Sequence, residues 1–285
     1  MRSRSEAFFH QLPDSAPHGQ RYAVWHQPSV APAALVVYVH PFAEEMNKAR
    51  RMAALQSRAF ADCGLAVLQL DLLGCGDSAG DFGDATWQRW VADVKAACEL
   101  SRQLHARDWP GVTCPPLWLW GLRAGSLLAC AAAADMPEPV NFLFWQPSPS
   151  GKAVLQQFLR LKVAAAMGQA DTKGVSEQLK ADLAAGRHVD VAGYRLAPGL
   201  AAGLELASMT PPAHAGQALW LEATLRQETT LLPASQAVVA RWLTAGVQVQ
   251  EHVAAGPSFW STVEIEDAPE LVAATTQLMQ GAVSR

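Results

Sequence analysis

The segment from Pro116 to Ala134 reads PLWLWGLRAGSLLACAAAA and places a strand, a sharp turn and a helix in immediate succession. Its first five residues are apolar and aromatic, which predicts a buried strand. Gly121 and Gly125 bracket the turn, because a tight strand-to-helix connection leaves no room for Cβ atoms. From Ser126 onward the residues are small, so the predicted helix can lie close against a sheet. The central residue of the turn, Arg123, is therefore expected at the carboxyl edge of that sheet.

The same alternation of strand and helix extends along the chain on both sides of this segment. Largely apolar runs predict further strands at 22–25, 34–39, 65–71, 140–145, 218–222 and 247–253. Helical spacing of apolar residues predicts helices at 47–63, 87–98, 233–244 and 268–279. Strands that alternate with helices predict an α/β fold with a mostly parallel, doubly wound sheet.

The alternation of strands and helices is interrupted between Pro147 and Ala213. Helical patterns there are interrupted by Gly and Pro, and no strong strand run appears. We expect this segment to be a helical cap inserted above the sheet. The expected organisation is a first part of the core at 20–146, the cap at 147–213 and a second part of the core at 214–280.

The composition is that of a globular protein with a large core. The 285 residues are 50% hydrophobic and 17% charged, which excludes the disordered and collagen-like classes. A net charge of -4 offers no broad basic surface to nucleic acid. No apolar run approaches the roughly 20 residues of a membrane-spanning helix. The basic N-terminus is not followed by the apolar region of a signal peptide, so a cytoplasmic location is expected.

The five cysteines are odd in number and show no C-x-x-C spacing. This pattern argues against a disulfide framework and against a structural zinc site. We therefore expect no metal and no cofactor.

Two motifs resemble those of the α/β-hydrolase superfamily. The glycine spacing of residues 121–125, GLRAG, is that of the G-x-S-x-G nucleophile elbow. Residues 71–78, DLLGCGDS, resemble the D-x-x-G-x-G-x-S loop of the same superfamily. The order of elements from about Gln20 to Met279 is similar as well. The resemblance therefore implies an α/β-hydrolase fold over nearly the whole chain.

A narrower resemblance rests on residues 40–48, HPFAEEMNK, together with the elbow and Phe259-Trp260. These stretches are similar to the second of two hydrolase-like families associated with exosortase A systems. Proteins of that family accompany exopolysaccharide and protein-sorting loci in Gram-negative bacteria. The resemblance implies action on an ester, a thioester or an acyl group in that setting.

The residues themselves depart from a catalytic triad, in which a histidine accepts the proton of a nucleophile and an acid orients the histidine. Arg123 replaces the serine; a guanidinium stays protonated, with a pKa above ~12, and has no lone pair for attack. Residues 254–260, AAGPSFW, hold no histidine, and His252 is expected to be an ordinary strand residue. Glu222 or Glu228 can supply the acid, but neither has a histidine to orient. The triad is degenerate, and standard Ser-His-Asp hydrolysis is not expected.

Other groups near the predicted site could replace the serine. The candidates are Cys75, Ser78 and a water molecule held by Glu44 or Glu45. None of them has an evident partner in the sequence, and the sequence favours a structural role for Cys75, as a small residue tolerated in a tight turn.

Arg123 has two interpretations. In the first, its guanidinium and the N–H groups at the start of a helix form an anion-recognition site with the 40–42 loop. In the second, Arg123 pairs with Glu44 or Glu45 and fills the vacated pocket as a buried ion pair. The sequence leaves both interpretations open.

The other candidate ligand-binding residues surround this turn. His40 resembles the histidine whose ring braces the oxyanion loop, and Phe42 belongs to the same loop. Asn47 and Lys48 open the next helix and either reach the pocket or face solvent. Two functional classes stay open: an unconventional hydrolase or acyl-transfer enzyme, and a non-catalytic pseudoenzyme that binds an anionic ligand or a protein partner.

Overall fold

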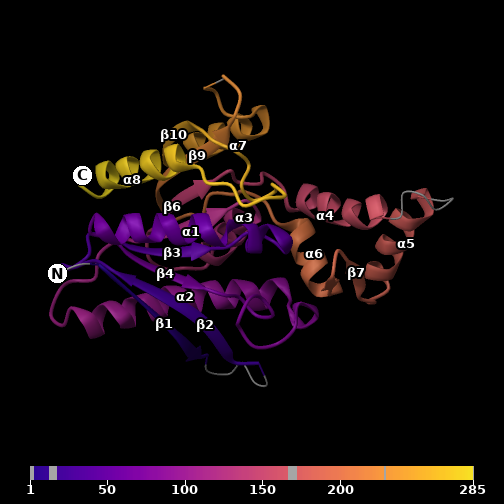
Figure 1. Ribbon diagram of the computed structural model, residues 1–285, viewed down its shortest axis with the longest axis horizontal. Coiled ribbons are helices and arrows are strands. Elements are labelled where there is room, and N and C mark those ends of the chain that lie inside the picture. The colour runs from indigo at the N-terminus through magenta and orange to yellow at the C-terminus, as the bar shows by residue number, and fades with distance from the viewer. Residues whose placement is uncertain (1–2, 13–17, 166–171, 228, 285) are drawn as a thin grey trace.

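The fold is built on an eight-stranded sheet, seen in a computed structural model that describes residues 3–12, 18–165, 172–227 and 229–284 (Figure 1). Its strand order is β1-β2-β4-β3-β5-β6-β9-β10. The strands are β1 (Arg4–Gln11), β2 (Gln20–Gln27), β3 (Leu35–Val39), β4 (Ala66–Leu70), β5 (Leu117–Leu122), β6 (Val140–Trp145), β9 (Ala215–Thr224) and β10 (Gln248–Ala255). Strand β2 runs antiparallel to both of its neighbours, and the pairs from β4 to β10 are parallel. The predicted mostly parallel α/β sheet is confirmed.

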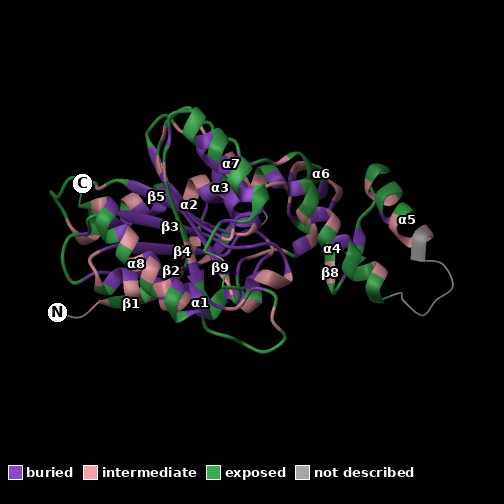
Figure 2. Ribbon diagram, turned by 90° about the horizontal axis from the view of Figure 1, so that it is seen from above, coloured by how far each residue is buried: buried purple, intermediate pink, exposed green. Residues whose placement is uncertain are grey.

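Helices cover both faces of the sheet because its central strands are apolar on both sides. Helices α1 (Glu44–Asp62) and α8 (Pro269–Val283) pack on one face. Helices α2 (Trp87–Asp108), α3 (Ala124–Ala133) and α7 (Pro233–Thr244) pack on the other. Figure 2 shows the resulting buried layer between the helices. No helix in the described part of the chain has the length and apolar character needed to cross a bilayer.

Between β6 and β9 the chain forms a separate group of elements. These are α4 (Gly151–Ala165), α5 (Thr172–Ala184), β7 (Val189–Val191), β8 (Tyr194–Leu196) and α6 (Pro198–Leu206). The labelled ones, α4, α5, α6 and β7, lie together on the right of Figure 1. The expectation of helices here is confirmed, but the segment also contains the β7–β8 hairpin. Three-residue strands are too short to produce a recognisable pattern, and their turn depends on Ala192 and Gly193, both with positive φ.

Strand β1 is a second element that the sequence patterns do not predict. Its residues, RSEAFFHQ, are mostly polar, and its side chains alternate between exposed and half-buried. It pairs with β2 from Arg4 opposite Gln27 to Gln11 opposite Gln20 and forms one edge of the sheet. Pairing with a neighbour, rather than apolar alternation, makes this segment a strand.

Candidate functional site

The site is organised around the turn that joins β5 to α3. Arg123 occupies the tip of this turn with φ 54° and ψ -120°, a left-handed conformation that costs about 1–3 kcal/mol in a residue other than glycine. Its N–H donates to the carbonyl of Trp145, 3.0 Å away at the end of β6, which fixes the turn against the next strand. The sequence prediction of an elbow at Arg123 is confirmed in its backbone geometry.

The two glycines of the elbow are required by close backbone contacts. A Cβ atom on Gly125 would lie 2.1 Å from the carbonyl oxygen of Val39, and one on Gly121 would lie 2.5 Å from the Cα of Ser126. The turn therefore packs directly against the end of β3 and against the first turn of α3.

The side chain of Arg123 is engaged on three sides. Its Nε donates to Oε1 of Glu45 in α1 at 3.2 Å, and its Nη2 donates to Oε1 of Gln157 in α4 at 3.4 Å. Its guanidinium carbon also lies 5.6 Å from the ring centroid of Trp260, in the loop after β10. The Arg123 side chain is 17% exposed and that of Glu45 is 12% exposed. Of the two glutamates named by the sequence, Glu45 is the one that pairs with Arg123.

The two helix starts at this site carry opposite charges. Arg123 precedes α3, where the positive end of the helix dipole disfavours a cation, whereas Glu44 and Glu45 lie in the first turn of α1, where the dipole favours anions. In the pair between Arg123 and Glu45, the arginine is therefore disfavoured by the dipole of α3, and the glutamate is favoured by the dipole of α1.

Burial nevertheless penalises the charged carboxylates. Burial raises the pKa of Glu45, and the charge and hydrogen bond of Arg123 oppose this rise without cancelling it. Burial also raises the pKa of Glu44, whose Oε2 is buried without a hydrogen-bond partner in the described part of the chain. An acid in such surroundings is costly to keep ionised.

His40 and Phe42 serve as supports for the loop above β3. The His40 Nδ1 donates to the carbonyl of Pro41 at 2.9 Å, and its Nε2 accepts from the N–H of Leu72 at 3.4 Å. Burial lowers the pKa of His40, in keeping with this neutral arrangement. The ring of Phe42 packs edge-on against Phe82, Trp90 and Phe158.

Asn47 and Lys48 connect α1 to the segments that surround the elbow. The Asn47 amide donates to the hydroxyl of Tyr194 in β8 at 3.3 Å. The Lys48 ammonium donates to the carbonyl of Ser261, just after Trp260, at 3.4 Å. Both residues therefore lie at the rim of the site, and neither has a direct bond to Arg123.

The positions of the other triad members hold residues with different roles. Glu222 is buried; its Oε2 accepts from the N–H of Leu232 at 2.9 Å, at the start of α7, and its Oε1 accepts from the indole of Trp220 at 3.3 Å. His252 is exposed within β10, which confirms its assignment to a strand. Glu228 lies outside the described residues. Among the described residues, neither Arg123 nor Glu222 forms a hydrogen bond to a histidine.

The alternative nucleophiles are also held in structural roles. Cys75 is buried, and burial raises the pKa of its thiol, which keeps it protonated and unreactive. The Ser78 hydroxyl donates to the carbonyl of Asp71 at 2.5 Å and accepts from the N–H of Tyr22 at 2.9 Å. Neither group has a neighbouring base among its bonded partners.

A small cavity lies beside the elbow. A cavity of about 20 Å³ remains between the start of α1 and α4, lined by Phe42, Glu44, Glu45, Val154, Gln157 and Phe158. This volume has room for about one water molecule. No group of three or more His, Cys, Asp or Glu side chains suited to a metal occurs within residues 3–12, 18–165, 172–227 and 229–284.

Two residues of the site come from distant parts of the chain. The sequence points to Trp260 only through a family motif and gives no sign that its ring faces Arg123. Gln157 is one of several polar residues on α4, and no pattern distinguishes it before α4 is placed over the elbow.

Comparison with known proteins supports the fold. The family model described as serine aminopeptidase, S33, matches residues 30–186, which is more than half of the chain. No curated protein matches.

Three solved structures resemble this chain over nearly its whole length. An α/β serine hydrolase without lid from Xanthomonas campestris has 17% identity and a TM-score of 0.55, covering 99% of this chain and 94% of its own. Est1E from Butyrivibrio proteoclasticus, bound to ferulic acid, has 16% identity and a TM-score of 0.61, covering 93% and 96%. A thermostable carboxyl esterase from Bacillus coagulans has 16% identity and a TM-score of 0.59, covering 99% of each chain. At these identities the likeness establishes a common fold.

Proposed function

The chain belongs to the serine aminopeptidase (S33) family of α/β-hydrolases, and we propose that it is a non-catalytic member that binds an anionic group at Arg123. The ligand is a small molecule or a protein partner that carries a carboxylate or a phosphate. One observation carries this proposal: the residue at the nucleophile position is a cation that already holds a carboxylate, that of Glu45.

Loss of catalysis follows from the chemistry of the replaced residues. A guanidinium can neither attack a carbonyl nor give up its proton at ordinary pH. The loop that would bring a histidine to the nucleophile brings the indole of Trp260 instead. Removing a serine triad lowers turnover by about 10⁶. A pseudoenzyme with a degenerate triad is the simplest account of these residues.

The residues and helix start that remain at the elbow favour anion binding. The guanidinium presents several donors to a carboxylate or phosphate, and only one of its bonds to the protein is to an ionised partner. Helix α3 begins at Ala124, directly after Arg123, and the start of a helix favours an anion. Since Glu45 is costly to keep ionised, an external anion can take its place on Arg123 while Glu45 becomes protonated.

The elements between β6 and β9 are expected to control access to Arg123. We propose that residues 147–213 form a cap, inserted between core parts at 20–146 and 214–280. Gln157 and Phe158 of α4 cover the elbow, and the small cavity between α1 and α4 marks the route by which a ligand would enter. Movement of α4 away from Arg123 is then part of binding.

The biological system in which the ligand occurs is inferred from the sequence resemblance alone. The similarity of residues 40–48 and of Phe259-Trp260 to the exosortase A-associated family supports a place in an exopolysaccharide or protein-sorting system. A cytoplasmic location belongs to the same proposal.

One observation favours the alternative, hydrolysis or transfer of an ester, thioester or acyl group. The cavity beside Glu44 and Glu45 has room for about one water molecule, and Oε2 of Glu44 is buried without a hydrogen-bond partner in the described part of the chain. Under this alternative Arg123 orients the substrate, and a water at Glu44 or Glu45 acts as the nucleophile.

Calorimetric titration with acetate, glucuronate and inorganic phosphate tests the binding proposal. We expect at least one of these anions to bind, Arg123→Ala to lose that binding, and Arg160→Ala, at an exposed position of α4, to keep it. Glu45→Gln should bind more tightly than the wild type, because the internal competitor is then neutral. Absence of binding by both the wild type and Glu45→Gln would overturn the proposal.

A further inference from the structure

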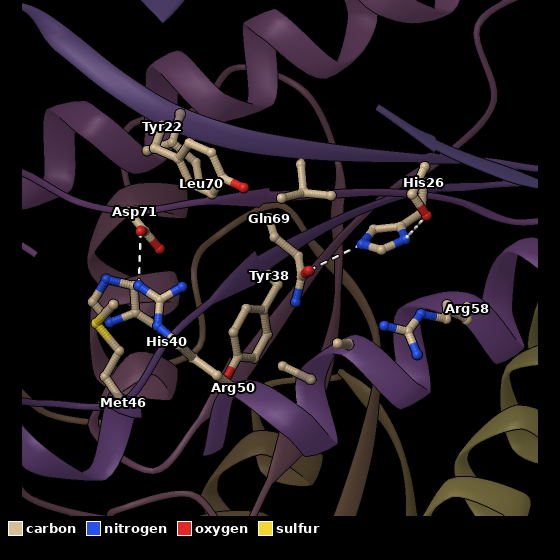
Figure 3. Close-up of a pocket in the computed structure, with 14 residues that line it drawn as sticks. Tyr22, His26, Tyr38, His40, Met46, Arg50, Arg58, Gln69, Leu70 and Asp71 are labelled. Atoms are coloured by element: carbon tan, nitrogen blue, oxygen red, sulfur yellow. Dashed lines mark hydrogen bonds and ion pairs between the residues drawn. The ribbon is translucent and has the colours of Figure 1, made fainter. Parts of the chain in front are cut away.

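A second and larger cavity lies away from the elbow, between α1 and the edge of the sheet. Its volume is about 320 Å³, near the lower limit of small-molecule sites. Side chains from β1, β2, β3, β4 and α1 line it, whereas Arg123, Glu45, Gln157 and Trp260 are not among its lining residues. Figure 3 shows this α1–β2 cavity with Arg50 and Asp71 at one end, Arg58 and His26 at the other, and Tyr38 between them.

The walls between the two ends are mainly apolar. They are formed by Tyr22, Val24, Met46, Ala53, Ala54 and Leu70. The alanines of α1 face the strand side chains and leave the space between them open. An apolar body a few carbon atoms long fits this stretch.

The arginines at the two ends of the cavity differ in whether they have a partner. At one end, Arg50 donates to Oδ2 of Asp71 at 2.8 Å, and that carboxylate also accepts from the N–H of Asp77 at 3.0 Å. At the other end, Arg58 forms no hydrogen bond or ion pair with any described residue. The α1–β2 cavity therefore has one unpaired positive charge at its mouth.

The groups around Arg58 do not neutralise this charge. The His26 Nε2 donates to Oε1 of Gln69 at 3.0 Å, and its Nδ1 accepts from the hydroxyl of Ser5 at 2.8 Å, which makes it a neutral ring. Asp62, one helical turn beyond Arg58, accepts a hydrogen bond from Ser3 instead.

Tyr38 lies in the wall between the two ends of the cavity. Tyr38 is 7% exposed, and its hydroxyl has no hydrogen-bond partner among the described residues. Its ring is held against that of Trp120, with centroids 4.5 Å apart, so the hydroxyl is fixed in place. The hydroxyl oxygen itself is buried, so Tyr38 presents its ring to the cavity and adds to the apolar wall.

We propose that the α1–β2 cavity binds a small amphipathic carboxylate. Its carboxylate pairs with Arg58, and its apolar body lies between Ala54 and Val24 and reaches toward Tyr38. Arg58 and Arg50 are eight residues, or about 12 Å, apart along α1, so an extended eight-carbon chain held at Arg58 ends before it reaches the Arg50–Asp71 ion pair. This inference is independent of the function proposed for Arg123.

Calorimetric titration with octanoate tests it, with 1-octanol as a neutral ligand of matched shape. We expect octanoate to bind the wild type at least tenfold more tightly than octanol, because a charge-assisted hydrogen bond is lost in the alcohol. Arg58→Gln should weaken octanoate binding at least tenfold. Arg241→Gln, at an exposed position of α7, should leave it unchanged.

Two further variants separate this site from the elbow. Ala54→Leu fills the α1–β2 cavity and should abolish octanoate binding, while Arg123→Ala should preserve it. Failure of the wild type to bind octanoate, equal binding by Arg58→Gln, or loss of binding in Arg123→Ala would each overturn the proposal. Thermal melts of each variant establish that it is folded.

Discussion

Two turns at the carboxyl edge of the sheet share a backbone conformation and differ in chemistry. The β3–α1 turn has Ala43 at φ 49° and ψ -125°, and the β5–α3 turn has Arg123 at φ 54° and ψ -120°. The first leads into a helix that begins with Glu44 and Glu45. The second carries a cation at the start of its helix.

The alanine turn shows that the strained conformation does not require a nucleophile. In both places the conformation occurs at the residue immediately before a helix at the sheet edge. The elbow geometry is therefore a property of the fold, and the side chains around it decide whether chemistry follows. The two turns differ in charge: one precedes two glutamates and the other carries an arginine. The ion pair between Arg123 and Glu45 connects the two turns across the site.

The largest expected effect comes from disturbing the packing of the second turn. Gly125→Ala should destabilise the protein by about 4 kcal/mol or more, because the new Cβ would lie 2.1 Å from the Val39 oxygen and 2.7 Å from the His40 oxygen. Urea denaturation followed by tryptophan fluorescence measures the loss. Gly281→Ala in α8 is the control: nothing lies within 4 Å of its Cβ, and it should gain roughly 0.5–1 kcal/mol. A cost below about 1 kcal/mol for Gly125→Ala would contradict this close approach of the turn to β3.

Arg123→Ala makes the second turn a copy of the first, so its effect reports the side chain alone. Loss of the cation leaves Glu45 buried without a partner, and we expect a destabilisation of about 2–3 kcal/mol. A double-mutant cycle with Glu45→Ala should give a coupling energy of about 1–3 kcal/mol.

The exposed pair between Lys95 and Asp135 provides the matched control for this cycle. Its atoms are 3.1 Å apart, but Asp135 is 79% exposed, so Lys95→Ala should cost less than about 1 kcal/mol. Additive single effects for Arg123 and Glu45 would show that their ion pair contributes nothing.

The third prediction concerns pH. Because the pKa of Glu45 is raised in the folded protein, the folded state holds this proton more tightly than the unfolded chain does. The stabilisation is complete below the ordinary value of 4.5 and is lost as pH rises through the folded pKa.

Glu45→Gln lacks this proton and should therefore gain stability relative to the wild type as the pH rises through that window. A difference of one pKa unit corresponds to about 1.4 kcal/mol. Urea denaturation of both proteins between pH 4 and pH 8 measures the difference, and an opposite trend would show that Arg123 outweighs burial at this site.

The smallest effect is expected from the third partner of Arg123. Trp260→Phe keeps an aromatic ring but weakens its attraction for the guanidinium, at a cost of about 0.5–1 kcal/mol. The same substitution in the Arg123→Ala background should cost less, because no cation then faces the ring. Equal costs in the two backgrounds would assign the effect to packing alone.

Much of the fold is predictable from the sequence because its core strands are apolar runs and its helices keep a regular apolar spacing. The turn at Arg123 is predictable for the same reason, since two glycines mark where Cβ atoms cannot fit. Strand β1 and the β7–β8 hairpin lack these signals: the first is polar and the others are three residues long.

The contacts of the site depend on tertiary placement. Glu44 and Glu45 are adjacent in sequence and point about 100° apart on a helix, so only the placement of α1 against α3 selects Glu45 as the partner of Arg123. Gln157 and Trp260 are separated from Arg123 by 34 and 137 residues and reach it only through the packing of α4 and of the loop after β10.

The most direct test of the central claim is turnover of p-nitrophenyl esters and acyl thioesters by the wild type, Arg123→Ala and Arg123→Ser. We expect no saturable turnover above the uncatalysed rate in any of the three, including the serine variant, because no described histidine forms a hydrogen bond at that position. Saturable turnover by the wild type that disappears in Arg123→Ala would contradict it and would make Arg123 part of a working enzyme.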